Sequence, residues 1–141
     1  MSSELPTQTS TSLSLVKAAV LGAAGYSGAE LCALLTRNPY FELCFAYASA
    51  GRKAEPFSSL YPRFQQQVDV LVEPWTDDEI ARITGKVDVA FLALPHEASE
   101  EVAPKLMAAG IVVVDLSGAF RLKQADLYPK FYGYEHQHPA L

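Results

Sequence analysis

Short runs of apolar residues alternate along this chain with segments whose apolar residues recur every three to four positions. Runs of the first kind predict buried strands, and segments of the second kind predict helices between them. The predicted strands are residues 17–21, 43–48, 68–72, 87–94 and 111–115, and the predicted helices are residues 28–38, 77–84 and 99–109. Strict alternation of strand and helix is typical of right-handed βαβ units. We therefore predict an α/β fold, a doubly wound and mostly parallel sheet with helices on both faces.

Sequence patterns predict the N-cap residue of one of these helices and the buried face of another. Thr76 and Glu79 have the spacing of a capping box, which predicts Thr76 as the N-cap residue of the second helix. In the third helix, Val102, Leu106 and Met107 share one apolar face and are expected to point into the core. From residue 116 onward the sequence has no regular pattern.

Length and composition bound the possible functions. A chain of 141 residues supports one domain, which we place at residues 15–141 after a polar, Ser/Thr-rich flexible tail of residues 1–14. The net charge of −5 argues against a nucleic-acid partner, and no apolar run approaches the ~18 residues of a membrane helix. Cys32 and Cys44 lack metal-ligand spacing and are expected to be buried, reduced thiols. A soluble, cytoplasmic protein is the resulting expectation.

Three glycines fall between the first predicted strand and the first predicted helix. Such a turn lets the main chain approach a diphosphate, which the free N–H groups and the dipole of a helix N-terminus favour. We assign Gly22 to the tight turn, Gly25 to the approach of the phosphates and Gly28 to packing of the helix on the strand. The spacing G-x-x-G-x-x-G departs from the common G-x-G-x-x-G, so a purely structural turn stays the alternative. The candidate cofactor-binding residues here are Gly22, Ala23, Ala24, Gly25, Tyr26, Ser27 and Gly28.

This motif predicts a Rossmann-type NAD(P)-binding domain, and the end of the second strand then distinguishes the two cofactors. NAD sites place an acid there for the ribose 2′-hydroxyl, whereas NADP sites place hydroxyls and cations for the 2′-phosphate. The segment after the second strand carries Ser49, Gly51, Arg52 and Lys53 and no acid. These groups suit a phosphate, so NADP(H) is the predicted cofactor, with a solvated basic loop as the alternative.

Polar residues also follow the last two predicted strands, at the same edge of the sheet. Leu94, Pro95 and His96 are expected near the nicotinamide half of the cofactor. Ser117 and the N–H groups around Gly118 are candidates for holding the nicotinamide carboxamide.

Candidates for chemistry beyond cofactor binding are few. Ser117 and Arg121 are the candidate substrate-binding residues, although a loop-closing salt bridge is an equal explanation for Arg121. His136 and His138 have a spacing used by zinc ligands, but no third ligand accompanies them and we predict no metal site. Neither cysteine lies at the functional edge of the predicted sheet, so we assign no catalytic residue.

Several segments taken together resemble one family. G-A-A-G-Y-S-G-A-E-L, A-L-P-H-E-A-S, V-V-V-D-L-S-G-A-F-R-L and Y-G-Y-E-H-Q-H-P-A-L occur in the order found in N-acetyl-gamma-glutamyl-phosphate reductases. The resemblance covers residues 16–141. It implies an NADPH-dependent reductase of arginine biosynthesis, which converts N-acetylglutamyl 5-phosphate into the semialdehyde and phosphate. Aspartate-semialdehyde dehydrogenases share the glycine turn but not the later segments, and a fragment like theirs is an alternative.

The resemblance also implies that the chain is only the cofactor-binding part of a longer protein. The nucleophilic cysteine of the family lies in a G-C-Y-P-T segment expected shortly after Leu141, and its catalytic histidine lies in the next domain. The chain alone is therefore expected to be inactive, to expose apolar surface near residues 120–134, and to belong to a homo-oligomer when full-length. A stand-alone NADP-binding module, or a structural domain without useful affinity, would also fit this sequence.

Overall fold

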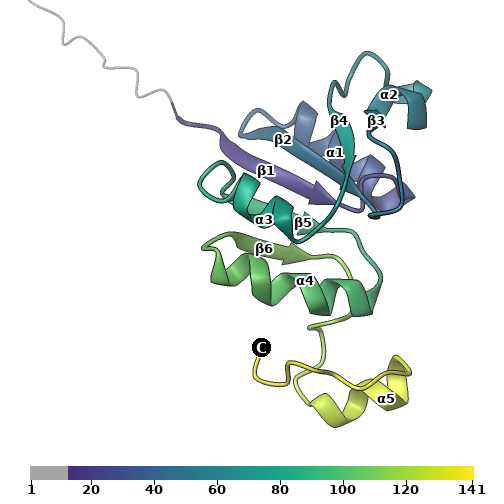
Figure 1. Cartoon of the computed structure of the whole chain (residues 1–141), viewed down its shortest axis with the longest axis vertical. Helices are drawn as coiled ribbons and strands as arrows, with labels where there is room; N and C mark the ends of the chain where they lie inside the picture. Colours follow the sequence, from purple (N-terminus) through teal and green to yellow (C-terminus); the bar gives the residue numbers. More distant parts are fainter. Residues whose placement is uncertain (1–12) are drawn as a thin grey trace, which may run out of the picture.

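The computed structural model of the chain describes residues 13–141, so the predicted tail lies outside the described residues except for its last two. Its centre is a six-stranded sheet in the order β3-β4-β2-β1-β5-β6 (Figure 1). All neighbouring strands are parallel except β3 and β4, which are antiparallel, so the predicted mostly parallel sheet is confirmed. The strands are β1 (Val16–Leu21), β2 (Phe41–Ala48), β3 (Glu55–Pro56), β4 (Leu71–Pro74), β5 (Val89–Leu92) and β6 (Val112–Asp115).

Helices cover both faces of this sheet, as predicted, because successive residues of β1 point to opposite sides. Ala18 and Val20 belong to a core cluster that includes α1, whereas Ala19 and Leu21 belong to a second cluster with α3 and α4. Figure 1 shows α3 and α4 on one side of the sheet and α1 on the other. The helices are α1 (Tyr26–Arg37), α2 (Phe57–Leu60), α3 (Asp78–Ile83), α4 (His96–Ala108) and α5 (Tyr128–Phe131), with short 3-10 turns at Pro62–Phe64 and Ala125–Leu127. Among residues 13–141, no helix has the length and apolar character needed to cross a bilayer.

The segment between β2 and β4 is more ordered than the sequence suggested. Phe57, which opens α2, is fully buried and packs against Phe64 with ring centroids 6.1 Å apart. The packed segment extends further along the chain than predicted. The strand expected at residues 68–72 therefore begins three residues later, as β4 at Leu71–Pro74. Val68 is buried but lies before the strand, which explains why its apolar character was misleading.

Two predictions about the helices are wrong. Thr76 is not the N-cap of α3, because the helix starts one residue later with Asp77 at that position and without a side-chain cap. The Glu79 carboxylate instead accepts hydrogen bonds from the Tyr47 hydroxyl (2.8 Å) and from Arg82 (3.0 Å). Met107 is 51% exposed and does not face the core.

The C-terminal segment is held together by aromatic stacking. Tyr128 is only 1% exposed, and its ring lies 4.5 Å from the His136 ring and 5.5 Å from the Tyr132 ring. Within residues 120–134, Phe131 is the only strongly exposed large apolar side chain, at 63%. The expected apolar surface there is therefore wrong in its extent. Exposed apolar side chains lie instead along β6 and just after it, at Val112, Val114 and Leu116.

Gly28 brings α1 against the turn after β1. A Cβ at this position would lie 2.0 Å from the Gly22 carbonyl oxygen, which is main chain and cannot move aside without shifting the helix. We expect Gly28→Ala to lower the free energy of unfolding by about 3 kcal/mol or more, measured by urea denaturation. Gly51→Ala is the matched control, because no atom lies within 4 Å of a Cβ there. Equal effects of the two substitutions would contradict this packing.

Candidate cofactor-binding site

A large apolar hollow lies at the carboxyl ends of the central strands. It is a cleft of about 680 Å³ that follows β1, β2, β4 and β5, the place where ligands of doubly wound sheets bind. Its walls come from the β1–α1 turn, the loops after β2, β4 and β5, and one face of α4. The lining residues are Leu21, Gly22, Ala24, Gly25, Ala48, Ser49, Ala50, Arg52, Trp75, Thr76, Asp77, Ala93, Leu94, Pro95, Ala98, Glu101 and Val102.

The glycine turn forms one end of this cleft. Gly22 has φ +92°, and a Cβ there would lie 2.1 Å from the Ala93 carbonyl oxygen, so only glycine fits. The N–H groups of Gly22 and Ala23 both donate to the Tyr47 carbonyl at 2.9 Å, which fixes the turn to the end of β2. Gly25 is open on its outer side, where a Cβ would meet only the Gly22 oxygen at 3.5 Å.

The first turn of α1 presents donors without acceptors. Gly25 is the N-cap and supplies no side-chain cap, and the first helical hydrogen bond runs from Ala29 N–H to the Gly25 carbonyl at 2.9 Å. Among the described residues, nothing accepts a hydrogen bond from the N–H groups of Tyr26, Ser27 and Gly28. Three free donors at the positive end of a twelve-residue helix form a site suited to an anion.

The predicted 2′-phosphate residues divide into two groups. Ser49 and Arg52 line the cleft, whereas Gly51 and Lys53 do not. The Arg52 side chain is 41% exposed, and its guanidinium pairs with Glu55 at 3.1 Å. Exposed pairs of this kind contribute at most about 1 kcal/mol, so an incoming phosphate can compete for the guanidinium.

Trp75, Thr76 and Asp77 form a wall that the sequence patterns did not predict. The N–H of Trp75 donates to the Ala48 carbonyl at 2.8 Å, which ties the end of β4 to the end of β2. The indole ring stands edge-on to the buried Tyr47 ring, with centroids 5.0 Å apart and an interplanar angle of 78°. Burial, followed by the hydrogen bond to Glu79, raises the pKa of Tyr47, so the phenol stays neutral. Correct placement of β4 would have revealed this wall.

A lysine bridges two carboxylates at the rim of the cleft. Lys105 Nζ lies 2.7 Å from Asp77 and 3.1 Å from Glu101, and both carboxylates line the cleft. Hydrogen bonds to Asp77 and then to Glu101 raise the pKa of Lys105, which therefore stays charged. The ammonium offsets part of the negative charge that would otherwise repel an anionic ligand.

The hydrogen-bond donors of the loop after β6 are already bonded within the protein. Ser117 N–H and Oγ–H both donate to the Asp115 carboxylate, and Ala119 N–H donates to Ser117 Oγ. Gly118 N–H donates to His96 Nδ1 at 2.9 Å, which places the ring proton of a neutral His96 on Nε2. Leu94 and Pro95 line the cleft, but His96 does not. A carboxamide that approached this loop would have to displace one of these hydrogen bonds or use the carbonyl groups.

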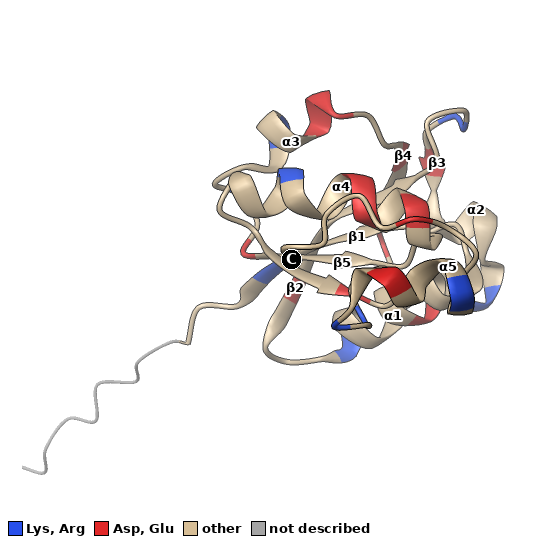
Figure 2. Cartoon of the chain, turned by 90° about the horizontal axis from the view of Figure 1, so that it is seen from below, with Lys and Arg blue, Asp and Glu red and all other residues tan. Residues whose placement is uncertain are grey.

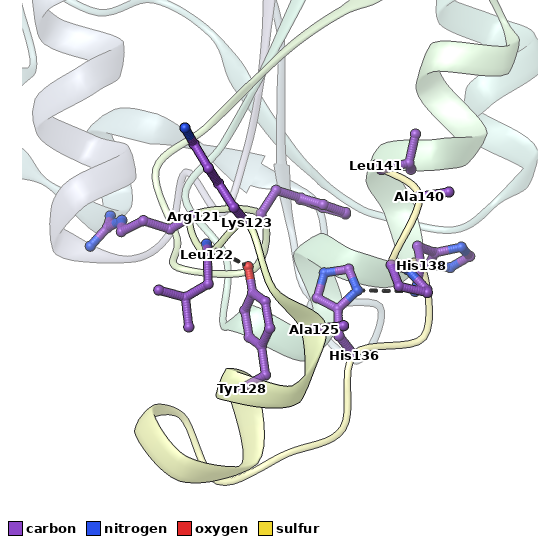
Figure 3. Close-up of a pocket in the computed structure, with 11 residues that line it drawn as sticks. Arg121, Leu122, Lys123, Ala125, Tyr128, His136, His138, Ala140 and Leu141 are labelled. Carbon is purple, nitrogen blue, oxygen red and sulfur yellow. Dashed lines mark hydrogen bonds between the residues drawn. The ribbon is translucent and has the colours of Figure 1, made fainter.

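Arg121 lies away from the cleft, in a smaller cavity of about 340 Å³ near the C-terminal segment. Its guanidinium donates to the Ser117 carbonyl at 3.2 Å, and Figure 3 shows it extending away from His136 and His138. His136 Nε2 lies 2.7 Å from the Ala119 carbonyl oxygen. Within the described part of the chain, no three His, Cys, Asp or Glu side chains are grouped to hold a metal ion.

Neither thiol is a nucleophile of the cleft. Cys32 is fully buried in α1, and burial raises the pKa of its thiol to about 12. The pKa of Cys44 is raised, chiefly by partial burial and then by the Glu42 carboxylate. Neither cysteine therefore lines the cleft.

Comparisons with known proteins identify the family of this chain. The family model for the semialdehyde dehydrogenase NAD binding domain matches residues 17–136. The N-acetyl-gamma-glutamyl-phosphate reductase of Aeromonas salmonicida is 41% identical over 129 residues, 90% of this chain and 38% of that protein. The reductase of the same name from Yersinia pseudotuberculosis is 43% identical over 122 residues, 85% of this chain and 36% of that protein. The chain thus spans less than two fifths of the length of these relatives.

A solved structure supports the fold. The crystal structure of aspartate semialdehyde dehydrogenase with NADP from Candida albicans superposes with a TM-score of 0.59 at 24% sequence identity. The match covers 79% of this chain and 32% of the other. Together with the sheet order, it confirms the predicted Rossmann-type architecture.

The burial of Cys32 predicts its reactivity. Because only the thiolate reacts and a pKa of about 12 leaves almost none at pH 8, the native chain should label at Cys44 and not at Cys32. Peptide mass spectrometry after iodoacetamide treatment at pH 8 measures this, and labelling in urea gives the reference rate for the unfolded chain. Equal rates at Cys32 with and without urea would show that α1 is not packed as described.

Proposed function

The chain belongs to the family of semialdehyde dehydrogenase NAD-binding domains, and from this premise we propose that it holds NADP(H) for an N-acetyl-gamma-glutamyl-phosphate reductase. The reductase assignment is supported by 41% and 43% identity to two proteins of that name. Because the chain spans only 36–38% of those relatives, it accounts for the cofactor-binding part of the activity alone.

One observation carries the proposal. The three free N–H groups of Tyr26, Ser27 and Gly28 follow directly on Gly25, which lines the end of the cleft together with Gly22. A dinucleotide needs donors for its diphosphate at a point where no side chain stands between the phosphate oxygens and the main chain. The turn supplies both conditions, and the helix dipole adds about half a positive charge.

The walls of the cleft suggest how the two halves of the cofactor lie. Ser49 and Arg52 are placed for the 2′-phosphate, and Trp75 offers an aromatic surface for the adenine ring. Ala93, Leu94 and Pro95, which follow β5, line the cleft beyond the glycine turn and suit the nicotinamide half. This orientation agrees with the general position of dinucleotides across the carboxyl edge of such sheets.

The bound cofactor would supply a hydride, and the residues of this chain would bind and orient it. Because neither cysteine lines the cleft, we place the thiol nucleophile and the substrate site in the part of the reductase that this chain does not span. Arg121 is a candidate for meeting a substrate anion there, because it lies outside the cofactor cleft and is exposed. On this proposal, the chain binds NADPH but does not reduce an acyl phosphate by itself.

The cofactor preference depends on Arg52. We expect the chain to bind NADPH more tightly than NADH in isothermal titration calorimetry, because only NADPH has a phosphate for the guanidinium. Arg52→Ala should weaken NADPH binding about tenfold and leave NADH nearly unchanged, since a charge-assisted hydrogen bond contributes about 1.5–3 kcal/mol. Arg63→Ala, which removes an exposed arginine paired with Glu30 outside the cleft, is the control. An unchanged NADPH-to-NADH ratio in Arg52→Ala would rule out the NADP assignment.

Trp75 provides a direct optical report, because it is the only tryptophan of the chain and lines the cleft. Both NADPH and 2′,5′-ADP should quench its fluorescence, since the adenylate group is expected to lie beside the indole. Trp75→Phe should bind NADPH within a few-fold of the unmodified chain and show no such signal. Calorimetric binding of NADPH with unchanged Trp75 emission would place the cofactor elsewhere.

A further inference from the structure

Glu100 is a buried carboxylate on α4 that the proposed cofactor contacts do not involve. Its side chain is 5% exposed, whereas Glu97 and Glu101 on the same helix are exposed. Figure 2 shows the acidic residues of α4 in red beside the C-terminal segment. A buried carboxylate is costly unless hydrogen bonds or an opposite charge compensate for the lost water, so its partners identify its role.

All of these partners belong to the C-terminal segment. Glu100 Oε1 accepts hydrogen bonds from the N–H groups of Gln137 and His138, the latter at 3.2 Å. The same oxygen lies 3.1 Å from Nδ1 of His136, whose side chain is only 3% exposed. The carboxylate therefore accepts hydrogen bonds from two consecutive residues and lies beside the ring of the one before them, 36–38 residues later in the chain.

His136 extends this contact to the loop after β6. Its Nε2 lies 2.7 Å from the Ala119 carbonyl oxygen, and because a carbonyl can only accept, Nε2 carries a proton. The ring is packed on its other sides by Tyr128, at a centroid distance of 4.5 Å, and by Phe120, at 5.2 Å. With Nε2 protonated, Nδ1 donates to Glu100 only in the imidazolium form, whereas in the neutral ring it accepts from His138 N–H at 3.1 Å, a group that Glu100 also binds. Glu100 thus orients His136, directly or through His138 N–H, and His136 contacts the loop.

A second residue on the same face of α4, His96, also contacts this loop. His96 precedes Glu100 by four residues, so the two side chains lie one above the other on the helix. His96 Nδ1 accepts a hydrogen bond from Gly118 N–H at 2.9 Å, directly beside the Ala119 carbonyl that His136 contacts. Adjacent residues of the loop are therefore fixed to α4, one directly and one through His136.

We propose that Glu100 is a positioning residue that acts through His136 to fix the loop of residues 117–121, which follows β6 beside the end of β5, where the nicotinamide half is proposed to lie. The inference rests on the proposed function, because the position of this loop matters only if the nicotinamide half lies beside it. Glu100 itself does not line the cleft. Its loss should therefore affect the nicotinamide half of the ligand and spare the adenylate half, which the proposed function places beside Ser49, Arg52 and Trp75.

The test compares two ligands that share the adenylate half. The unmodified chain should bind NADPH more tightly than 2′,5′-ADP, and Glu100→Ala should weaken NADPH binding about tenfold, the effect of losing roughly 1.4 kcal/mol, while 2′,5′-ADP changes less than about twofold. Glu97→Ala is the matched control, since this exposed carboxylate lies one turn earlier and outside the cleft. Glu100→Gln, which keeps an acceptor oxygen, should recover part of the NADPH affinity.

His136→Phe tests the same link if Glu100→Ala does not fold. Phenylalanine keeps the ring between Tyr128 and Phe120 but lacks the N–H that meets the Ala119 carbonyl, and it should give the same selective loss of NADPH affinity. Equal losses for both ligands in the folded variants, or unchanged NADPH binding, would overturn the positioning role. Equal affinity of the unmodified chain for the two ligands would also overturn it and leave the diphosphate site intact, whereas failure to bind either ligand would contradict the proposed function itself.

Discussion

The close approach of two main-chain segments, the turn after β1 and the first turn of α1, determines the rest of the site. Gly28 rests on the Gly22 carbonyl, and Gly22 in turn rests on the Ala93 carbonyl at the end of β5. Three segments therefore meet without a Cβ between them. The approach places the start of α1 next to the cleft, and its first N–H groups have no hydrogen-bond acceptor among the described residues. The same glycines thus explain both the packing and the open anion site.

The sheet brings the remaining groups to this point. Because β1, β2, β4 and β5 run parallel, their carboxyl ends deliver the glycine turn, Arg52, Trp75 and Pro95 to one edge. The two core clusters on opposite faces of β1 hold the strands in register, so the loops can vary without loss of the frame. Family membership fits a separation of the cofactor cleft from the substrate site. The relatives that share this region are more than twice as long, which leaves room for a substrate site elsewhere in them.

Local signals in the sequence predicted the parts of the site that depend on neighbouring residues. The glycine turn, the two-faced sheet and the position of Arg52 after β2 follow from short patterns, and the structure agrees with each of them. Tertiary contacts decided the rest. Glu79 accepts a hydrogen bond from Tyr47, 32 residues away, instead of capping its own helix. Because Val68 is buried, the sequence predicted the strand at residues 68–72 instead of at Leu71–Pro74, and Trp75 was not recognised as the residue that follows it. No local pattern could reveal the contacts of Glu100 with residues 136–138.

Amide NMR during titration with NADPH tests the diphosphate site most directly. If the phosphates meet the main chain at the start of α1, the ¹H–¹⁵N signals of Tyr26, Ser27 and Gly28 should move together and saturate with the binding isotherm. The bonded N–H groups of Gly22 and Ala23, which already donate to the Tyr47 carbonyl, should move less. Saturation of the chain with NADPH while the signals of Tyr26, Ser27 and Gly28 stay in place would contradict the account.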